Sequence, residues 1–350
     1  MTILVTGGAG FIGSNFIIDW FKNNNEPIIN IDKLTYASNH SNIDFLLPQN
    51  ELYTFIHGDI CNKDILTKIF SKNDISAVIN FAAESHVDKS IQNPSEFIKT
   101  NIIGTFELLE ISREYIKKSN KNFKFMHIST DEVFGDLNQG EPSFSENNSY
   151  KPNSPYSASK ASSDHLVRAY NKTYKLPTLI TNCSNNYGPY QYPEKLIPLT
   201  IKNLLKNEGI PLYGDGSQIR DWLYVGDHCS ALRLILDKGK VGKTYNIGGD
   251  SEKTNLEVVS LICEILDKLI PSKNLKSYKE LICFVEDRPG HDTRYAIDSS
   301  FLKSTLGWNQ SVDFKTGIKQ TIQWYLNNPA SLSEEQIDFE NHWLKKSSKN

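Results

Sequence analysis

The first part of the chain, up to Asp32, constrains the fold more than any other stretch. An apolar run at residues 3–5 predicts a buried strand that ends in a glycine-rich turn, Gly-x-x-Gly-x-x-Gly, at residues 7–13. Apolar side chains then recur at helical spacing over residues 11–21, and a second apolar strand ends at the aspartate. This order of elements is typical of a dinucleotide-binding unit, although the glycine spacing differs from the commoner Gly-x-Gly-x-x-Gly.

Each residue type in this unit has a physical role in holding a dinucleotide. Gly7, Gly10 and Gly13 allow a tight turn and a close approach of the backbone to the pyrophosphate. The N-terminus of the following helix offers unpaired N–H groups and a positive dipole end to that anion. Asp32 lies about 20 residues further on, where a carboxylate accepts hydrogen bonds from ribose hydroxyls and repels a 2′-phosphate. The unit therefore predicts NAD rather than NADP as the cofactor.

Strand-like and helical segments alternate as far as residue 183. Such alternation predicts a parallel sheet with helices on both faces. We therefore expect an α/β protein with a Rossmann-type, doubly wound NAD-binding domain over residues 1–183. A smaller mixed α/β substrate-binding domain is expected to occupy most of 184–350, with segments near 220–247 returning to the first domain. The predicted strands are 53–57, 77–83, 123–128 and 177–183, and the predicted helices include 62–71, 94–117 and one that starts at residue 155.

Two of the predicted strand ends carry residues with two open interpretations. Asp59 is placed to hold an adenine amino group, but an aspartate after a glycine is equally a turn residue. Ala82 and Ala83 would leave room for a cofactor, and small core residues are the alternative.

Residues 129–135 follow the predicted strand at 123–128 and contain two adjacent carboxylates, Asp131 and Glu132. The carboxyl ends of strands in open α/β sheets face the ligand crevice. On a straight strand the two acids would point to opposite faces, whereas in a turn just past the strand both can reach one ligand. Two adjacent acids chosen at random more often lie in a solvated loop. The interpretation of Asp131 and Glu132 therefore depends on the rest of the chain.

Tyr156 and Lys160 lie one helical turn apart on one face of the helix that starts at residue 155. A free phenol titrates near about 10. A neighbouring ammonium and the positive nicotinamide would stabilise the phenolate, so that Tyr156 becomes a usable base near neutral pH. Tyrosine and lysine occur at this spacing by chance in many helices. Their combination with a dinucleotide unit and an acid pair favours a catalytic pair.

Composition limits the other functions that the chain can have. The chain has 350 residues and a formal net charge of −3, which provides no basic field for nucleic acid. No apolar run approaches the roughly 20 residues that span a bilayer, so no membrane partner is expected. The five cysteines are scattered without a Cys-x-x-Cys pair, which indicates neither zinc nor a disulfide framework and fits a cytoplasmic setting. No metal is expected.

Together these motifs resemble the extended short-chain dehydrogenase/reductase family over nearly the whole chain. The glycine-rich turn, the Tyr156/Lys160 pair and Asn-Asn-Tyr-Gly-Pro at residues 185–189 carry this resemblance.

Four further segments resemble the branch of that family that removes water from nucleotide-activated glucose. They are residues 82–88, the Thr-Asp-Glu triplet at 130–132, and residues 193–198 and 288–292. The triplet is the most specific, because sugar-nucleotide epimerases of the same fold lack the acid pair. Phe134 stands where tyrosine is expected, a departure that should matter little to the chemistry.

The resemblance implies a mechanism for these residues. Tyr156, assisted by Thr130 and Lys160, takes the proton of the sugar 4-hydroxyl while hydride passes from C4 to NAD. Glu132 then removes the C5 proton and Asp131 protonates the departing 6-hydroxyl. Hydride returns from NADH to C6, which regenerates NAD in each turnover. One acid must be protonated while its neighbour is ionised, and like-charge proximity separates two carboxylates in this way.

The resemblance also implies the remaining ligand contacts. With the glycines and Asp32, the NAD site would include Phe11, Ile12, Lys33, Asp59, Ile60, Ala82, Ala83, Thr100, Tyr156, Lys160 and Asn186. The dTDP-glucose site would include Ser85, Thr130, Asn185, Lys195, Leu196, Pro211, Tyr213, Arg220, Asn255, Arg288 and His291. The arginines also suit a diphosphate chemically, with surface ion pairing as the alternative for these and for Arg294. Members of the family commonly pair as homodimers through a four-helix bundle of the helix near Pro94 and the helix of Tyr156.

Three alternatives remain open at this point. Related enzymes that act on UDP-glucose carry a similar triplet, so the sequence does not separate the two nucleotides. An NAD-dependent sugar-nucleotide 4-epimerase needs Tyr156 and NAD but no acid pair. A non-catalytic NAD sensor would usually have lost Tyr156 or Lys160.

Overall fold

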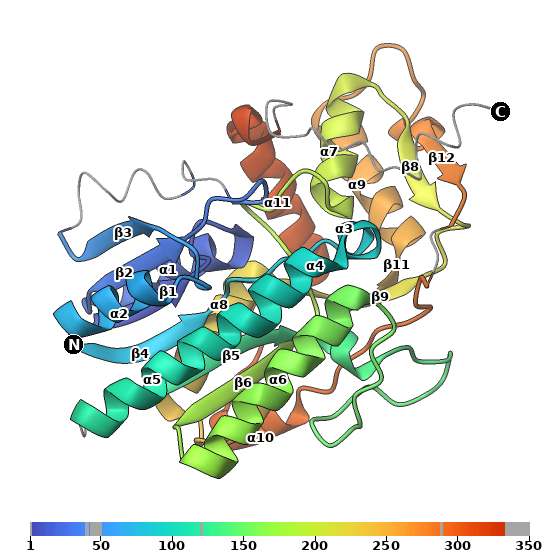
Figure 1. Cartoon of the computed structure of the whole chain (residues 1–350). Helices are drawn as coiled ribbons and strands as arrows, with labels where there is room; N and C mark the ends of the chain where they lie inside the picture. Colours follow the sequence, from blue (N-terminus) through green and yellow to red (C-terminus); the bar gives the residue numbers. More distant parts are fainter. Residues whose placement is uncertain (1, 39–41, 43–50, 120–121, 288–289, 333–350) are drawn as a thin grey trace.

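The structure is a computed structural model that describes residues 2–38, 42, 51–119, 122–287 and 290–332 (Figure 1). A seven-stranded sheet forms its larger part, in the order β10-β6-β5-β4-β1-β2-β3. All neighbouring pairs in it are parallel. The predicted doubly wound parallel sheet is therefore confirmed. Its strands are β1 (Thr2–Thr6), β2 (Ile28–Asp32), β3 (Tyr53–His57), β4 (Ile75–Asn80), β5 (Lys124–Thr130), β6 (Thr178–Cys183) and β10 (Thr244–Ile247).

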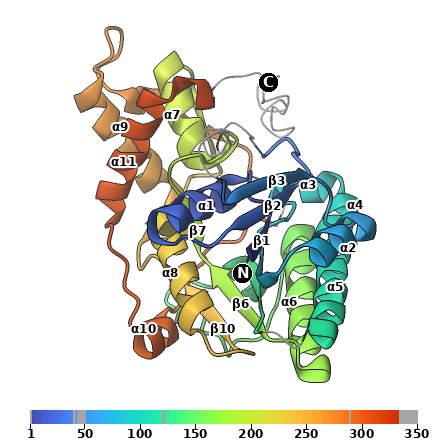
Figure 2. The same ribbon diagram turned by 90° about the vertical axis from the view of Figure 1, so that its left-hand side faces the viewer.

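Helices cover both faces of this sheet because both faces are apolar. One core packs α1 (Phe11–Asn23) and α8 (Val225–Lys238) against the strands, through residues such as Phe16 and Leu232. The other packs α2 (Lys63–Lys72), α5 (Thr105–Ser119) and α6 (Pro155–Tyr174), through residues such as Leu66 and Leu109. Figure 2 shows α1 and α8 on one side of the strands and α2, α5 and α6 on the other.

The segment expected to form one α-helix over residues 94–117 is not α-helical throughout. It begins as α4 (Pro94–Phe97), continues as a π-helix, η3 (Ile98–Gly104), and ends as α5. In a π-helix the hydrogen bonds span five residues, an arrangement found often at functional sites. Here it places Thr100 in the crevice wall and buries the side chain of Asn101 between the helix and the loop after β4.

A second, smaller part follows β6 and has its own core. Its two small sheets are β11-β9-β7 and β12-β8, and three helices pack around them. This confirms the expected smaller mixed α/β unit, although β8, β11 and β12 carry no pattern that predicted them. The elements are β7 (Asn185–Tyr187), α7 (Leu196–Lys206), β8 (Ile210–Tyr213), β9 (Ile219–Tyr224), β11 (Glu252–Thr254), α9 (Asn255–Leu269), η5 (Tyr278–Leu281), β12 (Ile282–Val285), α11 (Phe314–Asn327) and η6 (Pro329–Leu332).

The chain crosses between the two parts more than once. The expected return near 220–247 starts at α8, because β9 belongs to the three-stranded sheet and only α8 and β10 join the large one. A later element, α10 (Ser300–Leu306), also packs on the large sheet, since Leu302 and Trp308 lie in the same core as α8. The sequence pattern of residues 333–343 also predicts a helix, but this segment lies outside the described residues. Within the described residues, no helix has both the length and the apolar composition to cross a membrane.

Candidate active site

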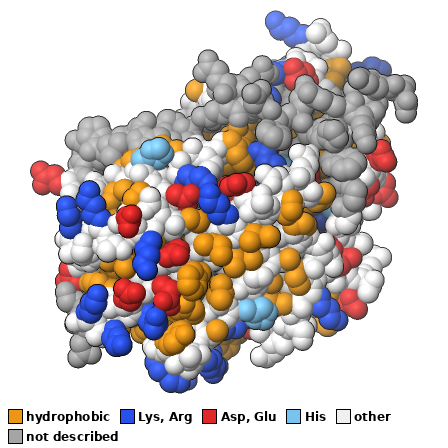
Figure 3. All heavy atoms as spheres, viewed as in Figure 1, with side chains coloured by type: hydrophobic (Ala, Val, Ile, Leu, Met, Phe, Trp, Pro, Cys, Tyr) orange, Lys and Arg blue, Asp and Glu red, His pale blue; other side chains and the backbone are white. Residues whose placement is uncertain are grey.

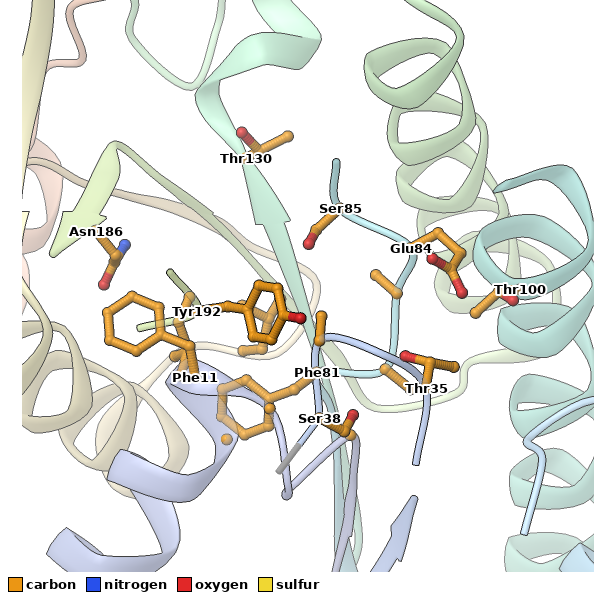
Figure 4. A pocket seen from close by; sticks show the side chains of 18 of the residues that line it. Phe11, Thr35, Ser38, Phe81, Glu84, Ser85, Thr100, Thr130, Asn186 and Tyr192 are labelled. Carbon is orange, nitrogen blue, oxygen red and sulfur yellow. The ribbon is translucent and has the colours of Figure 1, made fainter. Parts of the chain in front are cut away.

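The carboxyl ends of β1, β4, β5 and β6 open into a crevice that also borders the smaller part of the molecule. Two pockets lie there and share Ser85, Glu132, Asn185, Asn186 and Lys195 among their lining residues. Figure 4 shows side chains from several separate segments, among them Phe11, Glu84, Thr130 and Tyr192, around the first pocket. The first pocket is lined by all the residues predicted to contact NAD: Gly7, Gly10, Phe11, Ile12, Gly13, Asp32, Lys33, Asp59, Ile60, Ala82, Ala83, Thr100, Tyr156, Lys160 and Asn186.

The glycine-rich turn is held close to the sheet by backbone and side-chain contacts. Gly7 has a φ of +69°, and a Cβ there would come within 2.6 Å of the Ala82 nitrogen, so only glycine fits. Asp32 accepts hydrogen bonds from the backbone N–H groups of Ala9 (2.9 Å) and Leu34 (2.8 Å). Helix α1 begins at Phe11, and its N-cap residue, Gly10, provides no side-chain cap. Its first N–H groups are therefore available to an anion such as a pyrophosphate.

The acid pair lies in a short 3-10 helix, η4 (Asp131–Phe134), directly after β5. The Thr130 hydroxyl donates to Asp131 Oδ1 at 3.3 Å and accepts from the Glu132 backbone N–H at 3.3 Å. Asp131 is only 2% exposed. Burial, then the neighbouring carboxylates of Glu132 and Asp221, raise the pKa of Asp131 well above its usual range. The fold therefore favours the protonated form of Asp131, while Glu132 lines both pockets.

Tyr156 and Lys160 face the same pocket from α6, but the pKa of Tyr156 is not lowered as the sequence led us to expect. Burial and then the Glu132 charge raise the pKa of Tyr156 well above 10, against a hydrogen bond with Thr130 that lowers it. The Lys160 ammonium donates to the Ile128 carbonyl at 2.7 Å. Burial lowers the pKa of Lys160 to about 8. The protein's own groups therefore do not stabilise the phenolate, because burial outweighs them.

The second pocket is lined by most residues predicted to contact the sugar nucleotide: Ser85, Asn185, Lys195, Leu196, Pro211, Tyr213, Arg220, Asn255 and His291. Thr130 lines the first pocket instead. Arg288 lies outside the described residues. Arg220 is buried beside Tyr295, with its guanidinium carbon 4.4 Å from the ring centroid. Arg294 forms a two-bond ion pair with Glu252 (2.6 and 2.8 Å), which is the alternative that the sequence left open for it.

Some residues of the site were not predicted from the sequence. Tyr36 donates to Glu194 at 3.3 Å, and the Lys89 ammonium lies 2.7 Å from the centroid of the Tyr36 ring. Glu194 lines both pockets, so this cluster lies where they meet. No local pattern signals it, because its members come from three separate loops and helices. Other unpredicted lining residues are Thr35, Ser38, Phe81, Cys183, Gln191 and Tyr192 in the first pocket, and Trp222 and Tyr295 in the second.

No group of three or more His, Cys, Asp or Glu side chains among the described residues is arranged to hold a metal ion. The groups that could act on a substrate are instead a buried acid, a carboxylate, a phenol and an ammonium. They surround a crevice that also contains an anion-binding turn. Such an arrangement defines a dinucleotide-dependent enzyme of the short-chain dehydrogenase/reductase type.

Comparison with known proteins narrows this class. Residues 4–321 match the model of the GDP-mannose 4,6 dehydratase family. The chain is 51% identical, over 98% of its length and 98% of the relative's, to a dTDP-glucose 4,6-dehydratase of Salmonella typhimurium. It belongs to this family of nucleotide-sugar 4,6-dehydratases, within which its similarity to the dTDP-glucose 4,6-dehydratases is confirmed.

Two solved structures agree with this assignment. The dTDP-glucose 4,6-dehydratase of Bacillus anthracis, in complex with NAD, superposes with a TM-score of 0.83 at 45% identity, covering 94% of this chain and 98% of that one. The enzyme of Streptomyces venezuelae, with NAD and TYD bound, gives a TM-score of 0.85 at 41% identity, with the same coverage of 94% and 98%.

Proposed function

We propose that the protein catalyses the NAD-dependent dehydration of dTDP-glucose to dTDP-4-keto-6-deoxyglucose. The observation that carries this proposal is the acid pair at the end of β5, in which Asp131 is held protonated beside Glu132. The pair lines the same crevice as Tyr156 and Lys160. The similarity to a dTDP-glucose 4,6-dehydratase supports it, as does the NAD bound in the solved structure of the Bacillus anthracis enzyme.

The first step is oxidation at C4 of the sugar. NAD supplies the hydride acceptor, held by the glycine-rich turn and by Asp32. Tyr156 accepts the proton of the 4-hydroxyl, and Thr130, which lowers the pKa of this phenol against the effect of burial, assists it. Because burial keeps the pKa of Tyr156 high in the protein alone, the positive charge of the nicotinamide contributes to making the phenol a base.

The second step is elimination of water across C5 and C6. The 4-keto group acidifies C5, so that Glu132 can remove its proton as a carboxylate base. Asp131 is protonated and donates its proton to the departing 6-hydroxyl. Two adjacent carboxyls with opposite protonation states therefore perform the two halves of one elimination. Hydride return to C6 and proton return to C5 form the product. Proton exchange with solvent, which takes the gained proton from Tyr156 and restores the lost one to Asp131, completes the turnover.

Incubation with dTDP-glucose in heavy water tests this proposal. A dehydratase should yield a 4-keto-6-deoxy product that carries deuterium at C5, detected by mass spectrometry and proton NMR. Formation of a C4 epimer without loss of water would instead identify an epimerase. Parallel kinetics with UDP-glucose measure the nucleotide preference, and a higher kcat/KM for UDP-glucose would reject dTDP-glucose as the substrate.

We also propose that the protein is a homodimer that pairs α5 and α6 with their copies in a four-helix bundle. Three large apolar side chains on the η3 and α5 segments are exposed, Ile98 (51%), Ile103 (45%) and Phe106 (37%). Figure 3 shows hydrophobic atoms gathered over this face of the molecule. Exposed apolar side chains that cluster in this way mark interaction surfaces.

Light scattering with two variants tests the dimer. The variant Phe106→Glu places a charge at this face and should give a monomeric mass at concentrations where the unmodified protein is dimeric. The variant Phe284→Glu changes the same residue type on β12, where the ring is 58% exposed, and should remain dimeric. A monomeric mass for the unmodified protein would reject the proposal.

A cytoplasmic location is proposed on separate grounds. All five cysteines are free thiols, among them the exposed Cys283 and the half-buried Cys61. Free thiols are kept reduced in the cytosol. Export to an oxidising compartment, measured by fractionation of the producing cell, would contradict this.

A further inference from the structure

A fully buried carboxylate lies one helical turn beyond Lys160, and the proposed mechanism does not use it. Asp164 has no exposed surface, and it continues a series at four-residue spacing along α6 that runs Tyr156, Lys160, Asp164, Arg168. Side chains at this spacing are neighbours on a helix. An ionised carboxylate in a low-dielectric interior is costly unless hydrogen bonds and a positive charge compensate it.

The hydrogen bonds to Asp164 come from the loop before α6 and from β6. Tyr150 donates its hydroxyl to Asp164 Oδ2 at 2.7 Å, and Asn182 donates its amide to the same oxygen at 3.2 Å. The Asn182 amide also donates to the Thr130 carbonyl at 3.0 Å. Asp164 therefore ties the helix that carries Tyr156 and Lys160 to the strand end that carries the Thr-Asp-Glu triplet.

The neighbouring histidine does not supply the positive charge. His127 on β5 lies 3.4 Å from Asp164 Oδ1 through its Nε2 atom, and its Nδ1 atom is 3.2 Å from the Asn80 amide nitrogen. With Asn80 donating to Nδ1, the proton of a neutral imidazole is on Nε2, directed at Ser163 (3.2 Å) and Asp164. Burial and then the charges of Lys160 and Arg168 lower the pKa of His127 well below its usual value.

The cations left for Asp164 are therefore Lys160 and Arg168. Arg168 reaches Asp164 through the Tyr150 hydroxyl, to which it donates at 2.5 Å. Burial lowers the pKa of Lys160, and the charge of Asp164 is the first of the influences that raise it again. The reverse also holds, because the Lys160 charge is the first to oppose the burial-driven rise in the pKa of Asp164.

We propose that Asp164 is a positioning residue, the buried countercharge that keeps the Lys160 ammonium protonated and directed at the crevice. A neutral lysine would lose the charge that assists the phenol and that faces the expected NAD site. The other titratable groups around Lys160 do not provide a negative charge at neutral pH. These are Tyr156 on its own helix, His127 on β5 and Cys183 on β6, whose thiol pKa burial raises to about 12.

Helix α6 also packs against α3 (Val87–Gln92), α4, α5 and η3, and η3 presents the neutral amide of Asn101 to Ser159 at 2.8 Å. The charged groups nearest in the crevice belong to η4, where Asp131 is protonated and Glu132 acts on the Tyr156 side. Asp164, fully buried and one helical turn from Lys160, is thus the carboxylate that acts on Lys160 most directly among the groups considered above.

The variant Asp164→Asn tests this inference, which rests on the proposed function. It keeps the size of the side chain and an oxygen for the Tyr150 and Asn182 hydrogen bonds, but it removes the charge. Loss of a nearby opposite charge shifts a pKa by about one unit or more. We expect the high-pH limb of kcat and of kcat/KM for dTDP-glucose to move to lower pH by about one unit, which lowers activity at pH ~8.5 about eightfold relative to the unmodified enzyme at the same pH.

Two further variants separate charge from structure. Ser163→Ala removes a neighbouring buried hydroxyl of the same network without changing charge, so its high-pH limb should match that of the unmodified enzyme. Tyr150→Phe removes one hydrogen bond that stabilises the carboxylate, and it should move the limb in the same direction by less. This variant also keeps the inference testable if Asp164→Asn fails to fold, because an unmoved limb in Tyr150→Phe would then overturn it.

NAD affinity can be measured without turnover, by calorimetry on protein freed of NAD. We would measure it between pH ~6 and ~10. Asp164→Asn should lose affinity at a lower pH than the unmodified protein. A folded Asp164→Asn variant whose limb and affinity profile are unchanged would overturn the role of Asp164, as would an equal shift in Ser163→Ala. Absence of dehydratase activity in the unmodified protein, with an affinity profile that still shifts in the variant, would reject the proposed function and leave this inference intact.

Discussion

Replacing Asp131 with asparagine should slow the reaction and stabilise the fold at the same time. Asparagine keeps the shape of the side chain and an oxygen that can accept the Thr130 hydrogen bond, but it has no proton to donate. Loss of a general acid lowers a rate by about 10²–10⁴-fold. That corresponds to about 3–5 kcal/mol in the activation barrier.

The stability change follows from the raised pKa of Asp131. The unfolded chain releases this proton near pH ~3.9, whereas the folded chain retains it to a much higher pH. The folded state then binds more protons than the unfolded state, so the free energy of unfolding falls as the pH rises above ~4. Each pKa unit between the unfolded value and the assay pH costs about 1.4 kcal/mol, which limits the cost at pH 7 to about 4 kcal/mol. We expect Asp131→Asn to gain about 1–3 kcal/mol at pH 7 and about nothing at pH 4.

Three measurements on Asp131→Asn check this reasoning. Urea unfolding at pH 4 and pH 7 should show the pH-dependent gain, and turnover of dTDP-glucose should fall while deuterium exchange at C5 and NADH absorbance at 340 nm persist. Asp215→Asn is the control, because Asp215 lies in an exposed turn where its hydrogen bond from the Ser217 backbone (2.9 Å) lowers its pKa. That variant should show no gain. A loss of stability for Asp131→Asn that is equal at both pH values, or unchanged turnover, would refute the assignment of Asp131 as a protonated acid.

Three further changes test other parts of the site. Glu132→Gln should abolish C5 exchange but still allow hydride transfer to NAD in a single turnover, and normal turnover by this variant would remove Glu132 from the role of base. Gly7→Ala should lose several kcal/mol of stability in thermal unfolding, because its Cβ would meet the Ala82 backbone at 2.6 Å, whereas Gly140→Ala, at φ +87° in open space, should cost about 1–2 kcal/mol. Equal losses for the two alanine variants would contradict the steric argument. Asp32→Ala removes acceptors for two backbone N–H groups and the expected ribose contact, so NAD affinity measured by calorimetry should fall about tenfold or more.

Much of the fold was accessible from the sequence, because its signals are local. The glycine-rich turn, the strand ends and the apolar periodicity of α1 and α6 each depend on residues within one or two turns of one another. The spacing of Tyr156 and Lys160 places them on one face of any helix, and the cap at Asn62, which accepts from two backbone N–H groups at 3.1 and 3.2 Å, begins α2 where the pattern indicates. The residues expected to contact NAD converge on one pocket for the same reason, since parallel strands bring their carboxyl ends to one edge.

Other features depend on contacts between segments far apart in the chain. The π-helix at 98–104 is one, because the buried contacts of Asn101 with Glu84 and Ser159 come from outside its own helix. The pairing of β8 with β12 is another, since it joins strands about 70 residues apart, and such short segments carry little periodic signal of their own.

The protonation states of the site were decided by the tertiary structure alone. Residue types alone leave Asp131 and Glu132 two equivalent acids, and only the family resemblance gives them different roles. Burial, then Glu132 and the distant Asp221, raise the pKa of Asp131, and burial raises the pKa of Tyr156 despite the hydrogen bond with Thr130. The sequence alone determined which chemical groups are present and in what order along the chain. Which of them bear a proton was set by desolvation and by charges through space, which exist only once the chain has folded.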